Sequence, residues 1–320
     1  MRQLRRESVP GAKGLAVVAS VCRNAYNPAN VRQTKATHRA RRKAEPNGGT
    51  QQPSLQVFLA RHPVFTNEEL AKSHARGGSG NLGTLRVLLS RQRARGRVLS
   101  VRRGVYAVVP FGTEADTAPV DPYLVASRLA PDAVLAYHTA LELHGHAHSA
   151  FANYQFLTRT AARACTFRSA VFQPVRVPRA LEGRGGDRVG VQTMDRMGLD
   201  LRVTTLERTC VDALDRPDLC GGWEEVFRSL ESVPYLDLEA LVAYALKLRS
   251  ATVAAKVGWF LELNAKRLDV SERVLRRLRS HAPQSRQYLD RGGKRGHRLA
   301  SGWNLMLPTV LAERRWKGES

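Results

Sequence analysis

The sequence predicts an α+β protein, in which a winged helix-turn-helix over residues 54–110 precedes a mixed α+β domain over residues 121–320. A chain of 320 residues is long enough for about two domains. The shorter region has helical spacing of apolar residues and then two strand-like runs, whereas the longer region has strand-like runs followed by helices. Between them, the stretch FGTEADTAPV at 111–120 has the composition of a linker.

Three short helices are expected in the first region. The first has an apolar face that includes Phe58. Thr66 and Glu69 have the spacing of a capping box, which predicts that a second helix begins there. Glycines at 77, 78 and 80 interrupt the chain, after which Ser79 or Asn81 can cap a third helix with leucines at 82, 85, 88 and 89.

A two-stranded wing should follow the third helix. Val98–Val101 and Val105–Val109 alternate as strands do, and a turn containing Arg102, Arg103 and Gly104 joins them. A helix supported by two others fits the major groove of DNA, and an arginine-tipped ribbon can reach the backbone or the minor groove beside it. We therefore predict that the following residues contact DNA: Ser79, Asn81, Thr84, Arg86, Arg91, Arg93, Arg102 and Arg103.

Charge supports this prediction and is unevenly distributed. The chain has a net charge of +23, which indicates a polyanionic partner. Residues 54–110 carry ten basic and two acidic residues, whereas residues 111–265 carry sixteen basic and nineteen acidic residues. Phosphate neutralisation drives DNA affinity, so the basic region suits DNA. The alternative is a basic helical domain with a solvated face.

The ends of the chain are also basic. Residues 1–53 have a net charge of +9 without sustained periodicity, and we expect a disordered basic arm. This arm can add sequence-independent DNA contacts, or it can be the product of an upstream start codon. Residues 266–320 have the same net charge, and the basic helix expected after Ser271 is either a solvated face or a second nucleic-acid contact.

The second domain should combine strands with many helices. Helices are expected from Asp121 and over residues 131–145, followed by strands at 154–158, 166–177, 189–194 and 199–203. Thr204 and Glu207 have capping-box spacing for another helix, within which Arg208 and Asp212 predict a surface ion pair. Later helices are expected at 222–230, 238–248 and 253–264, and the tail near Pro308 should be extended.

Patterns for metals, cofactors and catalysis are weak. His138 and the alternating histidines at 144, 146 and 148 fall around a helix end and favour a loop over a metal site. The glycine-rich stretch 77–84 lacks the Lys-Ser/Thr of a phosphate-binding loop. A nuclease would require a lysine beside its clustered acids, and no lysine lies near Asp195, Asp200 and Glu207 in the sequence. We therefore expect no enzyme activity, no metal and no cofactor.

Targeting signals are equally weak. The chain has no run of 18 apolar residues, and the apolar piece at 14–21 is a poor signal peptide. Its four cysteines are widely spaced, which favours reduced thiols and a cytoplasmic location without membrane attachment.

Several segments in order along the chain carry a family resemblance. They are RRGVYA at 102–107, PDAVLAYHTALELHG at 131–145, TTLERTCVDAL at 204–214, GGWEEV at 221–226 and GWNLMLP at 302–308. With these pieces the chain resembles the AbiEi family of antitoxins from type IV toxin–antitoxin systems, over nearly all of its length from about residue 54. The resemblance implies a DNA-binding autorepressor of an operon that also encodes a nucleotidyltransferase-like toxin, with antitoxicity in the C-terminal region.

We therefore expect a transcriptional autorepressor and antitoxin. Its partners would be double-stranded operator DNA with inverted repeats and, functionally, a cognate toxin. Two alternatives remain: an RNA-binding protein that uses the basic flanks, and a nuclease targeted by the winged helix. Stacking on aromatic side chains is the usual means of RNA recognition, but few aromatic residues interleave with the arginines of 86–103. RNA binding is therefore the weaker hypothesis.

Overall fold

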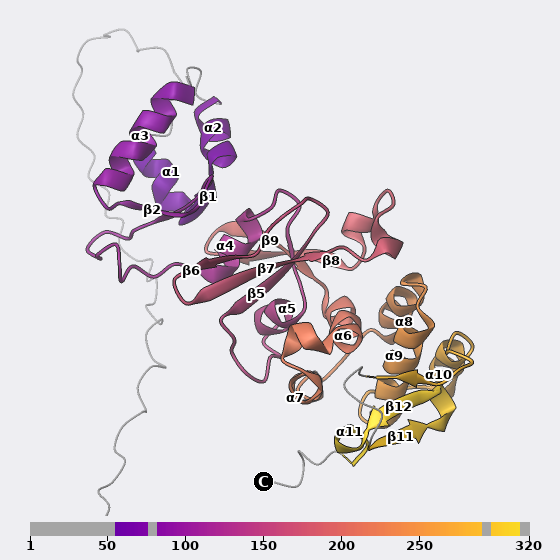
Figure 1. Cartoon of the computed structure of the whole chain (residues 1–320). Helices are drawn as coiled ribbons and strands as arrows, with labels where there is room; N and C mark the ends of the chain where they lie inside the picture. The colour runs from indigo at the N-terminus through magenta and orange to yellow at the C-terminus, as the bar shows by residue number, and fades with distance from the viewer. Residues whose placement is uncertain (1–54, 76–81, 290–295, 314–320) are drawn as a thin grey trace, which may run out of the picture. The chain divides into compact units, whose positions relative to one another are not determined.

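The computed structural model describes residues 55–75, 82–289 and 296–313 (Figure 1). It is an α+β protein, as predicted. The expectations for residues 1–53 lie outside the described residues, as do the predicted DNA contacts Ser79 and Asn81.

The first elements follow the order of a winged helix. They are α1 (Leu55–Arg61), β1 (Val64–Thr66), α2 (Asn67–Ala75), α3 (Leu82–Ala94), β2 (Val98–Arg102) and β3 (Val105–Val108). The three strands form an antiparallel sheet in the order β1-β3-β2. Strand β1 was not predicted, because its three residues are too few to show an alternation.

The predicted capping box is present at the start of α2. The backbone N–H of Thr66 donates to Oε2 of Glu69 at 2.7 Å, and the N–H of Glu69 donates to Oγ1 of Thr66 at 3.1 Å. Helix α2 then buries Leu70 in a small core with Phe58 and Phe65. This core fixes the three helices against the sheet.

A six-stranded mixed sheet follows, in the order β6-β7-β5-β4-β9-β8. Its strands are β4 (Val134–Leu135), β5 (Asn153–Thr158), β6 (Cys165–Phe167), β7 (Ala170–Arg176), β8 (Val191–Arg196) and β9 (Leu199–Thr204). The pairs β5–β7 and β4–β9 are parallel, and the other neighbours are antiparallel. The accompanying helices are α4 (Pro122–Arg128), α5 (His138–Leu143) and α6 (Leu206–Asp215).

The prediction of one helix over residues 131–145 is wrong in its first half. Leu135 pairs with Phe156 of β5 on one side and with Val203 of β9 on the other, so this segment is the strand β4. Tyr137 then takes a positive φ of 57°, and α5 begins only at His138. Pairing with two distant strands therefore overrides the local helical pattern.

Two other local expectations need correction. Thr205, not Thr204, caps α6, and its side chain accepts from the N–H of Arg208 at 3.4 Å. Thr204 belongs to β9, and Glu207 instead accepts from the N–H of Asp237 at 3.4 Å. The single strand expected over 166–177 is a hairpin of β6 and β7 that turns near Arg168, where φ is 54°.

The remaining chain forms a helical layer and a small sheet. Its helices are α7 (Trp223–Glu231), α8 (Leu238–Lys247), α9 (Ala251–Leu263), α10 (Glu272–Arg279) and α11 (Thr309–Glu313). Its strands are β10 (Gln287–Tyr288), β11 (His297–Ala300) and β12 (Leu305–Pro308), in the order β10-β12-β11. Short 3-10 turns lie at Arg179–Leu181, Gly186–Arg188, Pro217–Cys220 and Ser301–Trp303.

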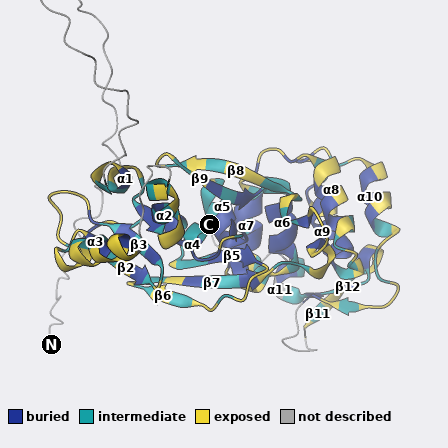
Figure 2. Ribbon diagram, turned by 90° about the horizontal axis from the view of Figure 1, so that it is seen from above, coloured by how far each residue is buried: buried dark blue, intermediate teal, exposed yellow. Residues whose placement is uncertain are grey.

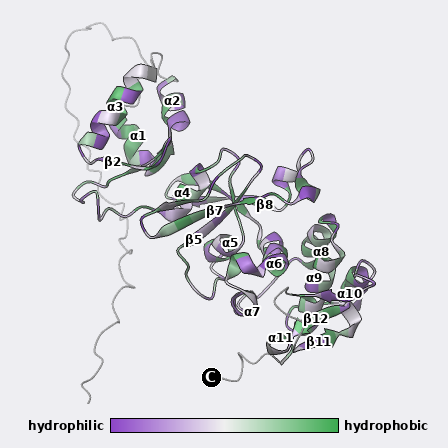
Figure 3. Ribbon diagram, in the orientation of Figure 1, coloured by the Kyte–Doolittle hydropathy of each residue, from purple (hydrophilic) through white to green (hydrophobic). Residues whose placement is uncertain are grey.

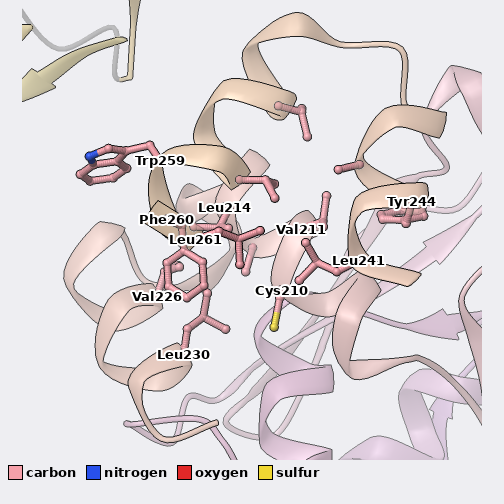
Figure 4. Packing of buried hydrophobic residues seen from close by; sticks show 14 of the residues in the cluster. Cys210, Val211, Leu214, Val226, Leu230, Leu241, Tyr244, Trp259, Phe260 and Leu261 are labelled. Atoms are coloured by element: carbon pink, nitrogen blue, oxygen red, sulfur yellow. The ribbon is translucent and has the colours of Figure 1, made fainter. Parts of the chain in front are cut away.

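The largest core joins these helices to the six-stranded sheet. Figure 4 shows Val211 and Leu214 of α6 packed with Leu230 and Phe260 of the neighbouring helices. The tail was expected to be extended, and β12 confirms this for Leu305–Pro308. The expectation is wrong after Pro308, where α11 begins at Thr309, because a proline is tolerated directly before the first turn of a helix. Trp303 lies so close to α9 that a Cβ on Gly258 would be 2.1 Å from its ring. The C-terminal segment is therefore part of the core.

Candidate nucleic-acid interface

Helix α3 is the element predicted to enter the groove, and its burial pattern has one apolar side. Leu85 and Leu89 are buried in the core with Phe58 and Phe65. Figure 2 shows the rest of α3 largely exposed, and Figure 3 shows hydrophilic and hydrophobic residues mixed along it. Two leucines one turn apart thus fix which face of the helix points outward.

The predicted contacts on α3 all face away from the core. Thr84, Arg86, Arg91 and Arg93 are exposed, as expected. Because the helix turns about 100° per residue, residues seven apart share a side. Arg86 and Arg93 therefore lie along one flank of α3, and Thr84 and Arg91 lie along the other.

Between these flanks lies the outer face of α3, formed by Gly83, Val87, Ser90 and Ala94. Val87 is two residues from both Leu85 and Leu89, which places it on the side opposite to them. All four residues of the outer face are exposed, and none is charged. The helix thus presents a narrow uncharged face between two flanks that carry arginines.

Sequence reasoning missed two further arginines near the end of α3. Arg95 and Arg97 are both exposed. Arg95 follows Arg91 by four residues, and this spacing was the available signal that it extends the Thr84–Arg91 flank.

The wing differs from the prediction at Arg102. This residue was expected at a free ribbon tip, but it is half-buried and its Nη2 donates to the carbonyl oxygen of Leu129 at the end of α4. Burial raises the pKa of the nearby Cys165 thiol, and Arg102 partly offsets this effect. Arg103, by contrast, is exposed. The two adjacent arginines therefore have different surroundings, and only Arg103 is open to solvent as expected.

The wing is anchored by more than Arg102. Val101 and Val105 share a buried cluster with Leu124 of α4 and with residues of the six-stranded sheet. Arg128 of α4 also forms an ion pair with Glu69 of α2, with 3.5 Å between Nε and Oε1. The side of the wing that faces α4 is thus covered, and α3 is the more open element.

A buried polar cluster lies around α5. The ring of His138 is fully buried, with Nδ1 3.4 Å from Oε1 of Glu142 and Nε2 3.3 Å from Oε1 of Glu225. Burial tends to raise the pKa of both carboxyls, but hydrogen bonds from His138, Tyr123 and backbone N–H groups outweigh it and lower both values. Two ionised carboxylates thus flank one imidazole.

This cluster holds the loop between α5 and β5 in place. Glu142 accepts from the N–H of Phe151 at 3.0 Å, and Glu225 accepts from the N–H and hydroxyl of Ser149, both at 2.8 Å. His144 contacts the carbonyl of Thr204 at 2.8 Å, and His146 contacts the hydroxyl of Ser232 at 3.1 Å. His138, His144 and His146 thus each contact a group from another element of the chain.

The acids considered for a nuclease do not converge. Asp195 and Asp200 are register partners on the β8–β9 hairpin, whereas Glu207 lies on α6 and contacts Asp237. In the described part of the chain, no three His, Cys, Asp or Glu side chains are grouped so as to hold a metal ion. A lysine does meet an acid elsewhere: Nζ of Lys256 lies 3.9 Å from Oδ1 of Asp215, and burial lowers the pKa of that lysine.

The ion pair expected on the surface of α6 is buried. Nε of Arg208 lies 3.1 Å from Oδ2 of Asp212, and both side chains are 3% exposed. Tyr244 donates to Oδ1 of Asp212 at 2.6 Å, and Nη1 of Arg208 donates to the carbonyl of Val189 at 2.6 Å. Burial alone would lower the pKa of Arg208, but the facing carboxylate raises it. This pair joins α6, α8 and the segment before β8.

Comparisons with known proteins identify the fold alone. No family model matches the chain, and no curated protein matches it. Among solved structures, the crystal structure of RV2827C protein from Mycobacterium tuberculosis is similar, with a TM-score of 0.51 and 18% identity. The match covers 82% of this chain and 92% of that chain. None of the helices in the described ranges has the length and hydropathy needed to cross a membrane.

Proposed function

We propose that this chain binds double-stranded DNA through α3 and acts as an antitoxin and transcriptional autorepressor of an AbiEi-like type IV toxin–antitoxin operon. The observation that carries the DNA-binding part is the outward side of α3, where an uncharged face lies between arginines on both flanks. The resemblance to AbiEi antitoxins supplies the rest of the proposal. In such a system the protein acts in the cytoplasm, where both operator and toxin are found.

The two flanks suit the two strands of a duplex. The major groove is about 12 Å wide and admits one helix, with a phosphate backbone on each side. When the outer face of α3 points into the groove, Arg86 and Arg93 lie towards one backbone and Arg91 lies towards the other. Only one acidic residue of this region, Glu68, is exposed, because Glu69 is held in the capping box. The unbalanced positive charge favours release of counterions from DNA.

The second domain is proposed to counteract the toxin. The part of this domain that precedes its basic end at 266–320 lies within residues 111–265, which carry a small negative net charge, so the surface of this part lacks the bias that favours nucleic acid. A protein partner or a functional counteraction of the toxin suits such a surface better. This division assigns operator binding to the first region and antitoxicity to the second.

DNA binding is tested with the full-length protein and a duplex selected from a random-sequence library. Arg86→Ala and Arg91→Ala should each lower affinity. If the lost contact is with phosphate, the fall is similar on all duplexes and the salt slope decreases by about 0.9. If Arg86 pairs with guanine, the loss is ~1–3 kcal/mol and one position becomes less selective. Unchanged binding in both variants would exclude α3 from the interface. A preference for single-stranded RNA over any duplex would favour the RNA-binding alternative.

Antitoxicity is tested with the same variants in cells. A strain carries the neighbouring toxin gene and the operon promoter fused to a reporter. The full-length protein with both Arg86→Ala and Arg91→Ala should lose repression and still relieve growth arrest. Persistent arrest with wild-type protein, shown to be folded and abundant, would contradict the antitoxin role without affecting the DNA-binding result.

A further inference from the structure

The outer face of α3 contains one large apolar side chain. Val87 is 51% exposed, although it lies at the middle of a helix whose other apolar side chains at Leu85 and Leu89 are buried. Valine is also a weaker helix former than alanine or the long polar residues, so the position does not favour it for local stability. Its exposure at the centre of the proposed interface makes it available for an apolar contact with a bound duplex.

The neighbours of Val87 restrict what that role can be. On the outer face of α3, which the structure describes completely, Ser90 has the one side chain that can form hydrogen bonds. The arginines lie on the flanks, where the two phosphate backbones would pass. The centre of the helix thus offers a branched apolar group to the floor of the groove. In the major groove, the apolar group that a base pair presents is the methyl of thymine.

We propose that Val87 reads the methyl group of a thymine at the centre of the bound site, while the arginines of the two flanks hold the phosphates. This inference rests on the proposed DNA binding by α3 and adds a sequence preference to it. It differs from specificity through an arginine–guanine pair, because the discriminating contact is apolar and lies on the outer face.

The test uses the duplex selected from the random library by the full-length protein. Each thymine is replaced in turn by deoxyuridine, which removes only the methyl group. Affinity is measured by fluorescence anisotropy for the wild type, for Val87→Ala and for the control Val57→Ala. Val57 is a matched control because it is also an exposed helical valine, 41% exposed, but lies on α1.

The wild type should lose about fourfold in affinity when uracil replaces the contacted thymine, the value for burial of one methyl group. Val87→Ala should bind the thymine duplex more weakly and should show no difference between thymine and uracil at that position. Val57→Ala should keep the wild-type difference. Alanine favours the helix more than valine, so Val87→Ala should fold, and a urea unfolding curve checks this.

Two results would overturn the inference, and they are distinguishable from failure of the proposed function. In the first, the wild type and Val87→Ala bind DNA sequence-selectively and are equally sensitive to uracil. This result would exclude the methyl contact by Val87 while leaving the proposed DNA binding intact. A change of oligomeric state in Val87→Ala, without a change in uracil sensitivity, assigns Val87 to a protein contact and overturns the inference as well. Absence of any duplex binding by the wild type contradicts the proposed function, and the inference with it.

Discussion

Arg102 and Arg103 are adjacent in the wing, but the structure predicts that their replacement has different effects. Nη2 of Arg102 donates to the carbonyl oxygen of Leu129, a residue that is 2% exposed. A hydrogen bond with a charged donor contributes about 1.5–3 kcal/mol. Arg102→Ala should therefore lower the free energy of unfolding by this amount and leave the carbonyl without that donor. Arg103 is exposed, so Arg103→Ala should change stability by less than about 0.5 kcal/mol.

DNA binding should show the opposite pattern. Arg103 is proposed to contact a phosphate beside α3, and loss of one phosphate contact reduces the slope of log affinity against log salt by about 0.9. Arg102 is occupied by Leu129, so Arg102→Ala should keep the slope. Urea unfolding of the full-length variants measures the first effect. The change in salt slope is measured from the affinity for the selected duplex between 50 and 200 mM salt. Over this range phosphate contacts change binding by orders of magnitude.

The reasoning fails if the two variants exchange roles. An Arg102→Ala protein with unchanged unfolding and a flatter salt plot would mean that Arg102 contacts DNA and not Leu129. Parallel salt plots for the wild type and Arg103→Ala would mean that the wing does not touch the duplex. In that case α3 would be the proposed DNA-contacting element between residues 55 and 108.

Two further predictions concern the second domain. Asp212→Ala should lower the free energy of unfolding in urea by about 3–5 kcal/mol because it leaves Arg208 buried and unpaired. The control Asp218→Ala breaks the pair with Arg216, which has a similar length but side chains 47% and 63% exposed, and it should cost less than about 1 kcal/mol. Equal losses in the two variants would contradict the role of burial. Glu142 and Glu225 have lowered pKa values in the fold, so their contribution is present above the unfolded value of about 4.3 and is lost as pH falls through the folded value. Unfolding curves between pH 3 and 7 should therefore show a smaller acid loss for Glu225→Gln than for the wild type, and parallel pH profiles would count against this cluster.

Local sequence patterns predicted many of the elements between residues 55 and 108 because the determinants of these elements are close in sequence. The Thr66–Glu69 capping box and the spacing of Leu85 and Leu89 identify α2 and the buried side of α3 within a few residues. The same spacing places Arg86 and Arg91 outward. Such features depend on the helical period alone, so no distant partner was needed to find them.

The errors arose where a distant segment decides the outcome. Leu135 has the local pattern of a helix, but it is a strand residue because Phe156 and Val203 pair with it. Arg208 and Asp212 have the spacing of a surface pair, yet Tyr244 and the chain before β8 cover them. Neither covering segment can be identified from spacing within one helix.

The joint between the winged helix and the six-stranded sheet was missed for the same reason. The stretch 111–120 has a linker composition, but Arg168 donates to the carbonyl oxygens of Ala115 and Ala118 within it. Helix α4 then shares a buried cluster with Val101 and Val105 of the wing. Removal of residues before 111 would thus expose apolar residues of α4 and take away the Arg102 contact. Misfolding of such a truncation would itself abolish antitoxicity. The two proposed activities are therefore better separated by surface substitutions on α3, which leave this joint intact.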